Sequence, residues 1–390
     1  MTAIKRKVIF RSPQQTDILI FERTGSNRIK KYILQDLPAH VLDSQVEELF
    51  IGIRIFLYFF LFLRYLNFSD SSELWQMPRS IARQIRRIYL LSCIKCFRPK
   101  VVVTWIDNYP MFHWLCDHYQ DAEFIAIQNG SRTRVEFRGL TTPYRINHFF
   151  CFGNYERDLY AEFGHRIDNY YPVGSVLGGY YRYVTARNRG VNVKQQYDIC
   201  IVSCWRGNIG NGPDVQMTME AMRKMDSLLA RYIQENKLSA CVVLRSEPGS
   251  ADRNIPVYGD EKEYFQSIYP EQVACIDPDF KGRNIYPIMD DSNLIVSSGS
   301  TALREAFGWG KKALYCDFTG TTFYTDYDSI IACRNDDYEL FKNRLDVIRL
   351  MPNEQYRSIT KTYASYIMNY DAALPAHICI NYKIKQLLAK

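Results

Sequence analysis

Short apolar runs alternate with stretches of helical periodicity along most of this chain. In the first half the apolar runs lie at residues 17–21, 100–106, 123–127 and 148–152. In the second half they lie at residues 198–203, 240–245, 273–276, 294–297 and 313–316. Apolar positions with helical spacing separate the runs of the second half, at residues 215–235, 262–268, 301–307 and 338–350. This alternation predicts an α/β protein whose parallel sheets are covered by helices.

A polar stretch at residues 185–196 divides the chain. It is rich in Arg, Asn and Lys and has no apolar period, so we expect a linker there. Two Rossmann-like domains are expected at residues 1–184 and 197–352, and residues 353–390 are expected to form helices that pack back on the first domain. Two such domains facing a central cleft form the GT-B architecture of glycosyltransferases and other nucleotide-sugar enzymes. The first domain would then hold the acceptor and the catalytic groups, and the second would bind the donor.

The segment that begins at Val296 carries the strongest local signal. An apolar run stops at four small residues, 297–300, and a helical run follows at 301–307. Ser300 is a good N-cap, and the free N–H groups of that helix would attract an anion such as a phosphate. Glu305 lies about 6 Å further along the helix axis, where its carboxylate could reach the ribose of a bound nucleotide. A capped helix with a surface glutamate is the alternative interpretation.

Polar side chains follow the apolar runs at the expected carboxyl edges of both sheets, where open α/β folds bind ligands. In the first half these residues are Asp107, Asn108, Gln128, Asn129 and Arg132. In the second half they are Ser203, Arg206, Arg245 and Ser246. Their amide and guanidinium groups could bind sugar hydroxyls, a carboxylate or a phosphate. The alternatives are a helix cap at Asp107, a plain turn at Gln128 and Asn129, and a surface position for Arg245.

An apolar stretch at residues 49–63 raises the question of a membrane. Arg54 interrupts it and Arg64 ends it, so it falls short of the ~20 apolar residues of a spanning helix. We expect a buried helix there. The next helix has isoleucines on one face and arginines on the other, namely Arg79, Arg83, Arg86 and Arg87. Together the two segments could rest on an anionic membrane without crossing it.

Composition narrows the class of partner and the compartment. The chain has 390 residues, a net charge of +7 and a pI near 8.7, which favours two domains and an anionic ligand such as a nucleotide. We expect no nucleic-acid partner. The 11 cysteines are scattered and odd in number, which favours reduced thiols, and Cys93 and Cys96 are interpreted as helix packing. No long apolar segment precedes a cleavage site at the N-terminus, so a cytoplasmic protein is expected.

Known sequence motifs do not indicate a metal site or a hydrolase activity. Two Asp-x-Asp pairs, at Asp277 and Asp279 and at Asp326 and Asp328, are interpreted as loops, because a metal-binding pair of this kind belongs to a different transferase fold. We expect no metal site and no cofactor. The chain contains no Walker A, GxSxG or HExxH motif, which weakens hydrolase and metalloprotease interpretations.

A series of longer motifs points to a family. In chain order they are TWIDNYPMFHWL, FIAIQNGSR, FCFGNYERDLY, YPVGS, YDICIVSCWR, VVLRSEPG, DEKEYF and SSGSTALREAFGWGKKALY. They resemble the bacterial surface carbohydrate (surface polysaccharide) biosynthesis proteins, from Asp17 to about Cys316. The IDNxP and QNGxR pairs are the most specific parts. These proteins look related to GT-B transferases that move Kdo or a similar nonulosonic acid from a CMP donor with retention.

The resemblance implies roles for individual residues. It implies that Asp107 attacks the anomeric carbon, as a retaining double displacement requires. It also implies nucleotide contacts at Ser298, Ser300, Thr301 and Glu305. With the neighbouring strand-end residues, the expected donor-binding set is Ser203, Arg206, Arg245, Ser246, Tyr286, Ser298, Gly299, Ser300, Thr301 and Glu305. The donor would be a substrate rather than a cofactor.

The sequence therefore favours a metal-independent, retaining glycosyltransferase of O-antigen or capsule synthesis. Its acceptor would be a glycan or glycolipid, and it would lie on the cytoplasmic face of the inner membrane or free in the cytoplasm. Two alternatives stay open. One is an enzyme of the same fold that uses a UDP-sugar or a CDP-polyol, and the CDP-polyol class would favour a catalytic histidine over Asp107. The other is a non-catalytic protein of the assembly complex.

Overall fold

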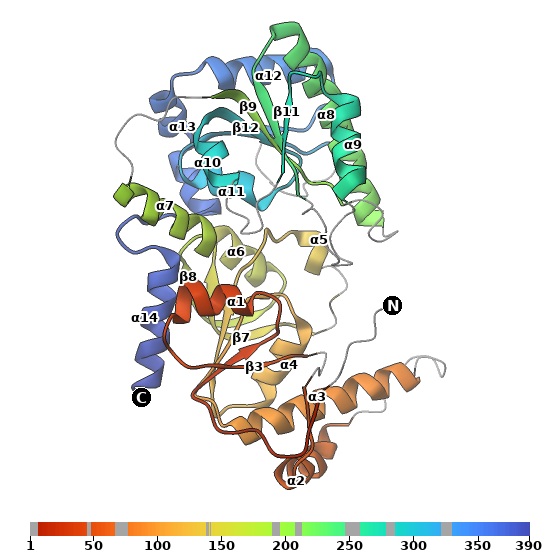
Figure 1. Cartoon of the computed structure of the whole chain (residues 1–390), viewed down its shortest axis with the longest axis vertical. Helices are drawn as coiled ribbons and strands as arrows, with labels where there is room; N and C mark the ends of the chain where they lie inside the picture. The colour runs from red at the N-terminus through yellow and green to blue at the C-terminus, as the bar shows by residue number, and fades with distance from the viewer. Residues whose placement is uncertain are drawn as a thin grey trace.

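The chain folds into two halves, each built around a sheet and shown one above the other in Figure 1. The computed structural model describes residues 7–44, 48–66, 77–137, 140, 142–188, 196–206, 213–245, 258–277, 285–320 and 330–390. Within these residues each half contains a six-stranded sheet whose strands all pair in parallel. The predicted α/β class with two parallel sheets is confirmed.

The N-terminal sheet has the strand order β3-β2-β5-β6-β7-β8. Its strands are β2 (Ile18–Phe21), β3 (His40–Leu42), β5 (Val101–Thr104), β6 (Glu123–Ile127), β7 (Arg145–Cys151) and β8 (Arg166–Pro172). Successive side chains point to opposite faces, so Leu19 and Phe21 enter one buried cluster and Ile18 and Ile20 enter another. Both faces are apolar because helices cover both of them.

Different helices cover the two faces of this sheet. One face packs against α3 (Met77–Phe97), α4 (Pro110–His118) and α6 (Asn154–Glu162). The other packs against the π-helix η1 (Ile29–Leu34), which α1 (Ser26–Arg28) precedes, and against α7 (Val176–Asn188) and α14 (Ala376–Leu388). A single turn, α5 (Arg134–Phe137), follows β6.

The C-terminal sheet has the strand order β11-β10-β9-β12-β13-β14. Its strands are β9 (Tyr197–Val202), β10 (Ala240–Val243), β11 (Ala274–Ile276), β12 (Ser292–Ser297), β13 (Lys312–Cys316) and β14 (Ala332–Cys333). Its helices are α8 (Pro213–Asn236), α9 (Tyr258–Ile268), α10 (Ile285–Asp290), α11 (Thr301–Gly308) and α12 (Tyr338–Leu350). One continuous buried cluster joins them to the sheet.

The last part of the chain returns to the N-terminal half. Helix α13 (Asn353–Ile367) contacts both α6 and α11, and α14 lies beside α7 and η1 (Figure 1). Glycines let the backbone between the two helices pass closely. A Cβ on Gly153 would lie 2.1 Å from the carbonyl oxygen of Tyr366, and one on Gly174 would lie 2.0 Å from that of Asn369. The C-terminal helices therefore pack against the first half, as the fold prediction states.

A small subdomain at one end of the N-terminal half contains β1 (Lys7–Ile9), paired with β4 (Glu48–Phe50), and α2 (Ile53–Phe62) with the 3₁₀ turn η2 (Leu63–Tyr65). The prediction of a buried helix here is wrong. Only Ile55 and Phe62 of α2 are buried. The side of α2 that faces α3 is covered, but the opposite side is apolar and exposed. No helix among the described residues is long and apolar enough to cross a membrane.

Candidate functional site

A pocket of about 240 Å³ opens at the carboxyl edge of the C-terminal sheet. The ends of β9, β10 and β12 and the first turn of α11 form its walls. The expected donor-binding residues that line it are Ser203, Arg206, Arg245, Gly299, Ser300 and Thr301. Side chains from separate strand ends thus meet at the edge where open α/β sheets bind their ligands.

Two arginines give the pocket its charge. Arg206 and Arg245 are exposed, and the guanidinium of Arg245 donates to the carbonyl oxygen of Trp205 at 3.2 Å. The buried carboxylate of Glu261 holds this wall in place. It accepts hydrogen bonds from the hydroxyl of Ser203 and from the backbone N–H of Arg245, the latter at 2.9 Å. An anion entering the pocket would therefore meet cations on a wall that hydrogen bonds keep fixed.

The N-terminus of α11 completes the pocket. The hydroxyl of Ser300 accepts from the N–H of Ala302 at 3.2 Å, which confirms the predicted N-cap. The positive end of the helix dipole therefore lies at the pocket wall. From the other half of the protein, the backbone N–H of Ser131 donates to the hydroxyl oxygen of Thr301 at 3.0 Å. The two halves of the chain thus meet at this wall.

Glu305 lies one turn further along α11 and is not among the residues that line the pocket. Its buried carboxylate accepts from the hydroxyl of Ser175, in the N-terminal half, and from that of Tyr286 at 3.3 Å. Burial raises the pKa of Glu305 to about 7, while both hydrogen bonds act in the opposite direction. Glu305 and Tyr286 therefore take part in a contact between the two halves.

Ser298, another expected donor-binding residue, is not among the residues that line the pocket. Ser298 is buried, and its hydroxyl has no hydrogen-bond partner within the described part of the chain. Ser246 and three acids of the Asp-x-Asp pairs, Asp279, Asp326 and Asp328, lie outside the described residues. Among the residues that are described, no group of three or more His, Cys, Asp or Glu side chains could hold a metal ion.

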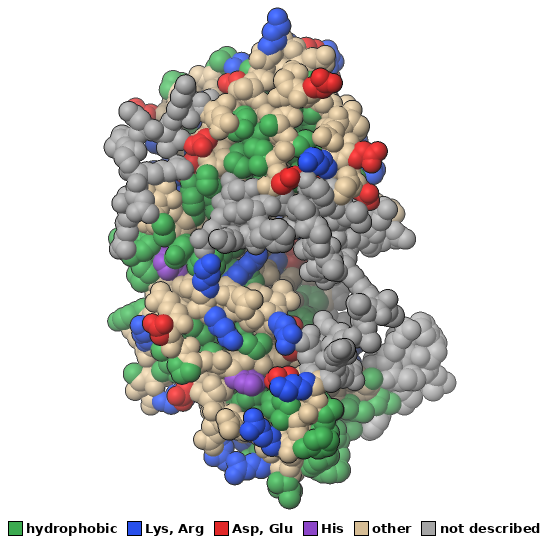
Figure 2. Space-filling view, viewed as in Figure 1, with side chains coloured by type: hydrophobic (Ala, Val, Ile, Leu, Met, Phe, Trp, Pro, Cys, Tyr) green, Lys and Arg blue, Asp and Glu red, His purple; other side chains and the backbone are tan. Residues whose placement is uncertain are grey.

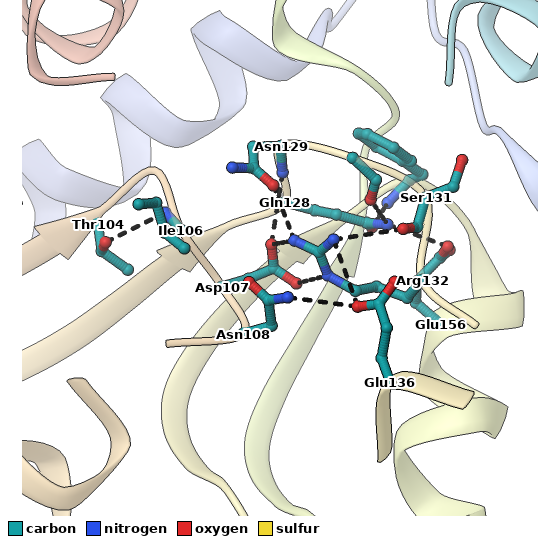
Figure 3. Close-up of polar contacts among 12 residues, drawn as sticks. Thr104, Ile106, Asp107, Asn108, Gln128, Asn129, Ser131, Arg132, Glu136 and Glu156 are labelled. Carbon is teal, nitrogen blue, oxygen red and sulfur yellow. Dashed lines mark hydrogen bonds and ion pairs between the residues drawn. The ribbon is translucent and has the colours of Figure 1, made fainter. Parts of the chain in front are cut away.

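Asp107 follows β5 and is fully buried. Figure 3 shows its carboxylate facing the guanidinium of Arg132, where Nε donates to Oδ2 at 2.8 Å and Nη2 donates to Oδ1. The hydroxyl of Tyr160 also donates to Oδ2, at 2.8 Å, and the N–H of Asn129 donates to Oδ1 at 3.4 Å. Burial alone would lower the pKa of Arg132, but the charge and hydrogen bonds of Asp107 raise it above its ordinary value. The guanidinium of Arg132 therefore keeps its charge although it is buried.

Gln128 is buried in a network that joins the two halves. Its amide nitrogen donates to Glu156 Oε1 at 3.0 Å, and its amide oxygen accepts from the N–H of Phe152 at 2.7 Å. Glu156 Oε1 also accepts from Arg304 of α11, at 2.8 Å. In this state the amide of Gln128 is occupied by protein groups and holds the loop after β6 in place.

Nothing in the sequence patterns singles out Glu136, on the short turn α5, except its position four residues after Arg132. Its carboxylate lies 3.7 Å from Nη1 of Arg132 and accepts from the amide of Asn108 at 3.3 Å. Burial raises the pKa of Glu136, and the charges of Arg132 and, more weakly, Arg206 act against that rise. The Glu136 side chain is 35% exposed. The charge of Arg206, which lines the pocket, thus lowers the pKa of a carboxyl group that belongs to the N-terminal half.

No protein-family model and no curated protein matches the chain. Solved structures do. The S. aureus MnaA–UDP complex is 14% identical, with a TM-score of 0.53 and 97% of each chain covered. The UDP-GlcNAc 2-epimerase of Methanocaldococcus jannaschii, in complex with UDP-GlcNAc and UDP, is 10% identical, with a TM-score of 0.50 over 96% of this chain and 99% of that one.

The N-terminal domain of Candida albicans trehalose-6-phosphate phosphatase is also similar, at 10% identity, with a TM-score of 0.50 and 99% of each chain covered. Identities this low establish the fold alone. Together with the two parallel sheets, they assign the chain the GT-B architecture of two Rossmann-like halves.

Proposed function

We propose that this chain is a glycosyltransferase that moves a sugar from a nucleotide-sugar donor to a bacterial surface glycan. The observation that carries the proposal is the pocket in which Arg206, Arg245 and the N-terminus of α11 converge. A phosphate is the ligand that such a wall attracts. Proteins of the same fold have been solved with UDP and with UDP-GlcNAc, which supports a nucleotide sugar as the ligand here.

The proposed donor is a CMP-linked acidic sugar such as Kdo, as the motif resemblance implies. Arg206 and Arg245 give the pocket two exposed guanidinium groups, one for the phosphate and one for the carboxylate of the sugar. These cations and the helix N–H groups can stabilise the charge that builds on the departing phosphate, so the proposed reaction uses neither a metal ion nor a cofactor. A UDP-sugar or a CDP-polyol is the alternative donor.

For the chemical step we propose Asp107 as the nucleophile. It would attack the anomeric carbon as the bond to the phosphate breaks, and an acceptor hydroxyl would then displace it with overall retention. Asp107 accepts four hydrogen bonds in the described state, so the attack requires Arg132 or Tyr160 to turn away first. Glu136 is the proposed base that takes the proton of the acceptor hydroxyl, because it is partly exposed and burial raises its pKa.

The acceptor is proposed to be a glycan or glycolipid that the enzyme meets in the cytoplasm. All 11 cysteines are free thiols, which supports a reducing compartment. Asn108, Asn129 and Arg132 are proposed to orient the sugar, because they surround the Asp107 carboxylate at the end of the N-terminal sheet.

Calorimetric titration with CMP, CDP, UDP, GDP and ADP tests the donor class. We expect CMP to bind most tightly, and Arg245→Ala to weaken that binding. Incubation of the chain with CMP-Kdo and no acceptor, followed by mass spectrometry, should then reveal a sugar adduct on the peptide that contains Asp107. A product with inverted anomeric configuration would refute the nucleophile. Release of a C2 epimer from UDP-GlcNAc would identify an epimerase instead.

A further inference from the structure

Helix α2 presents a stripe of large apolar side chains to the solvent. Its members follow the i, i+3, i+4, i+7 and i+8 spacing that places side chains on one face of a helix, and they are Ile53, Phe56, Leu57, Phe60 and Leu61. Their exposed fractions run from 50% at Phe56 to 77% at Ile53. Figure 2 shows hydrophobic side chains gathered at this end of the molecule, where Figure 1 labels α2. We call this surface the α2 stripe.

The α2 stripe is not required by the fold. The opposite side of α2 is the side that packs on α3, and it contains the buried Ile55 and Phe62. Single exposed leucines are common on protein surfaces, but a contiguous apolar patch marks a site of interaction. The neighbouring Phe10, just after β1, is 83% exposed and adds to the apolar character of this end.

Positive charge borders the α2 stripe. Arg54, on α2 itself, and Arg64, at its C-terminal end, are both exposed, and Arg83 is exposed on the adjacent α3. The segments that form α2, η2 and α3 contain no Asp or Glu. An anionic partner is therefore the one that this surface favours.

The arginine face predicted on α3 is partly occupied by the protein itself. Arg86 donates to the carbonyl oxygen of Ser44, and the guanidinium of Arg87 lies 5.7 Å from the ring centroid of Trp114. The side chain of Arg79 lies outside the described residues. Arg86 and Arg87 thus have partners within the protein, whereas the apolar side chains of the α2 stripe are exposed.

We propose that the α2 stripe inserts into the interface of an anionic phospholipid bilayer. Phe56 and Phe60 would lie among the acyl chains, and Arg54 and Arg64 would contact the phosphates. The stripe is about 12 Å long at ~1.5 Å per residue, so it lies flat on the bilayer and does not span it. A second copy of the chain is the other occupant that an apolar face can have. A two-fold interface, however, would set these arginines against one another, whereas lipid phosphates neutralise them.

If the proposed transferase function is correct, the bilayer contact would bring the enzyme to its acceptor. The α2 stripe belongs to the half that is proposed to bind the acceptor, so a lipid-linked acceptor would approach from the membrane side. The membrane contact itself does not depend on the reaction, because binding to vesicles is measured without substrate.

Flotation of the full chain with vesicles tests the proposal. Vesicles of phosphatidylethanolamine and phosphatidylglycerol in equal parts should carry the native chain upward, and pure phosphatidylcholine should do so less. The variant Phe56→Ser/Phe60→Ser should bind these vesicles at least about tenfold more weakly, because two ring insertions are lost. Its melting temperature should be unchanged, since both side chains are exposed. The matched control is Leu340→Ser/Val347→Ser, which alters side chains of α12 that are each 53% exposed and should float like the native chain.

Salt separates apolar insertion from charge attraction. High salt should weaken the binding of the native chain only in part, whereas Arg54→Glu/Arg64→Glu should remove its preference for phosphatidylglycerol. Equal flotation of the native chain and Phe56→Ser/Phe60→Ser would overturn the proposal. So would sedimentation showing a native dimer that the same variant converts to a monomer, together with no binding to vesicles, because the occupant would then be a second copy.

Discussion

Arg304 of α11 and Glu156 of α6 form a buried ion pair between the two halves of the protein, with 2.8 Å between Nη2 and Oε1. Their side chains are 5% and 0% exposed. The same Nη2 also donates to the carbonyl oxygen of Ile367, at the end of α13, at 2.7 Å. One guanidinium therefore connects α11 of the C-terminal half with α6 of the N-terminal half and with the end of α13.

Removal of this guanidinium should destabilise the whole protein. In Arg304→Met the carboxylate of Glu156 stays buried without its cation, and breaking a pair of this kind costs about 3–5 kcal/mol. Urea unfolding measures the change. The control is Arg157→Met, whose pair with Asp158 has both side chains about half exposed, and which should change the unfolding free energy little. Equal effects of the two substitutions would contradict a structural role for the buried pair.

The buried carboxyl of Glu305 should make stability depend on pH. Its pKa of about 7 in the folded protein lies above the ordinary value of 4.5, so folding favours the protonated form. That contribution is complete below about pH 4.5 and is lost as the pH rises through about 7, up to roughly 3 kcal/mol. Glu305→Gln stays neutral, so its unfolding free energy should fall less than that of the native chain between about pH 5 and pH 8.

Asp226 provides the comparison for Glu305, because burial also raises its pKa to about 7 but its partners, Tyr264 and Tyr269, lie within the C-terminal half. Asp226→Asn should flatten the pH dependence of stability without affecting the contact between the halves. Small-angle scattering across the same pH range should change in the native chain and in Asp226→Asn, but not in Glu305→Gln. An identical pH dependence in the native chain and in Glu305→Gln would exclude the raised pKa.

Arg245→Ala should weaken nucleotide binding by about 1.5–3 kcal/mol, the range for a lost hydrogen bond to a charged group. Isothermal titration of the nucleotide that binds best gives the number directly. Arg231→Ala is the matched control, since Arg231 is an exposed arginine of α8 that pairs with Glu235 far from the lining of the pocket. If a folded Arg245→Ala variant binds the nucleotide with unchanged affinity, Arg245 does not contact the donor.

Asp107→Asn should abolish transfer while donor affinity persists, because Asp107 belongs to the N-terminal half and the pocket to the other. It should also lower stability, since the buried Arg132 would lose the carboxylate that its Nε and Nη2 contact. Asp107→Glu should fail as well, because an attacking oxygen displaced by one methylene can cost ~100-fold in rate. Transfer by either variant at the native rate would exclude Asp107 as the nucleophile.

Glu136→Gln should lower kcat by about 10²–10⁴ if Glu136 is the base of the second step. A base must be deprotonated, so native kcat should rise with pH through the raised pKa of Glu136, and that limb should vanish in the variant. Donor affinity should not change. The neighbouring Glu162→Gln, which removes an exposed partner of Arg134, should leave both the rate and the pH profile as they are.

Local patterns in the sequence predicted most of the fold. Apolar runs located the central strands because those strands are buried on both faces, and the small polar residues before Thr301 located the helix start and its cap. The sequence patterns did not predict strands β3 and β8, which lack this burial. They lie at the two edges of the N-terminal sheet and are only partly buried, so neither forms a continuous apolar run.

The contacts of the candidate site depend on residues far apart in sequence, and no local pattern encodes them. Glu305 meets Ser175 across 130 residues, and Arg304 meets Glu156 across 148. The exposure of α2 was mispredicted because an apolar run indicates only that its side chains are hydrophobic. It does not show whether another part of the chain packs against them.

The position of α14 sets the order in which this protein can mature. Its side chains Ile380 and Ile384 fill the same buried cluster as Ile18 and Val101. A ribosome that has released the first sheet has therefore not yet released the helix that covers one of its faces. The core on that face of the N-terminal sheet cannot close until the residues around Ile384 have been synthesised, so the apolar face is open to chaperones, and to aggregation, until then.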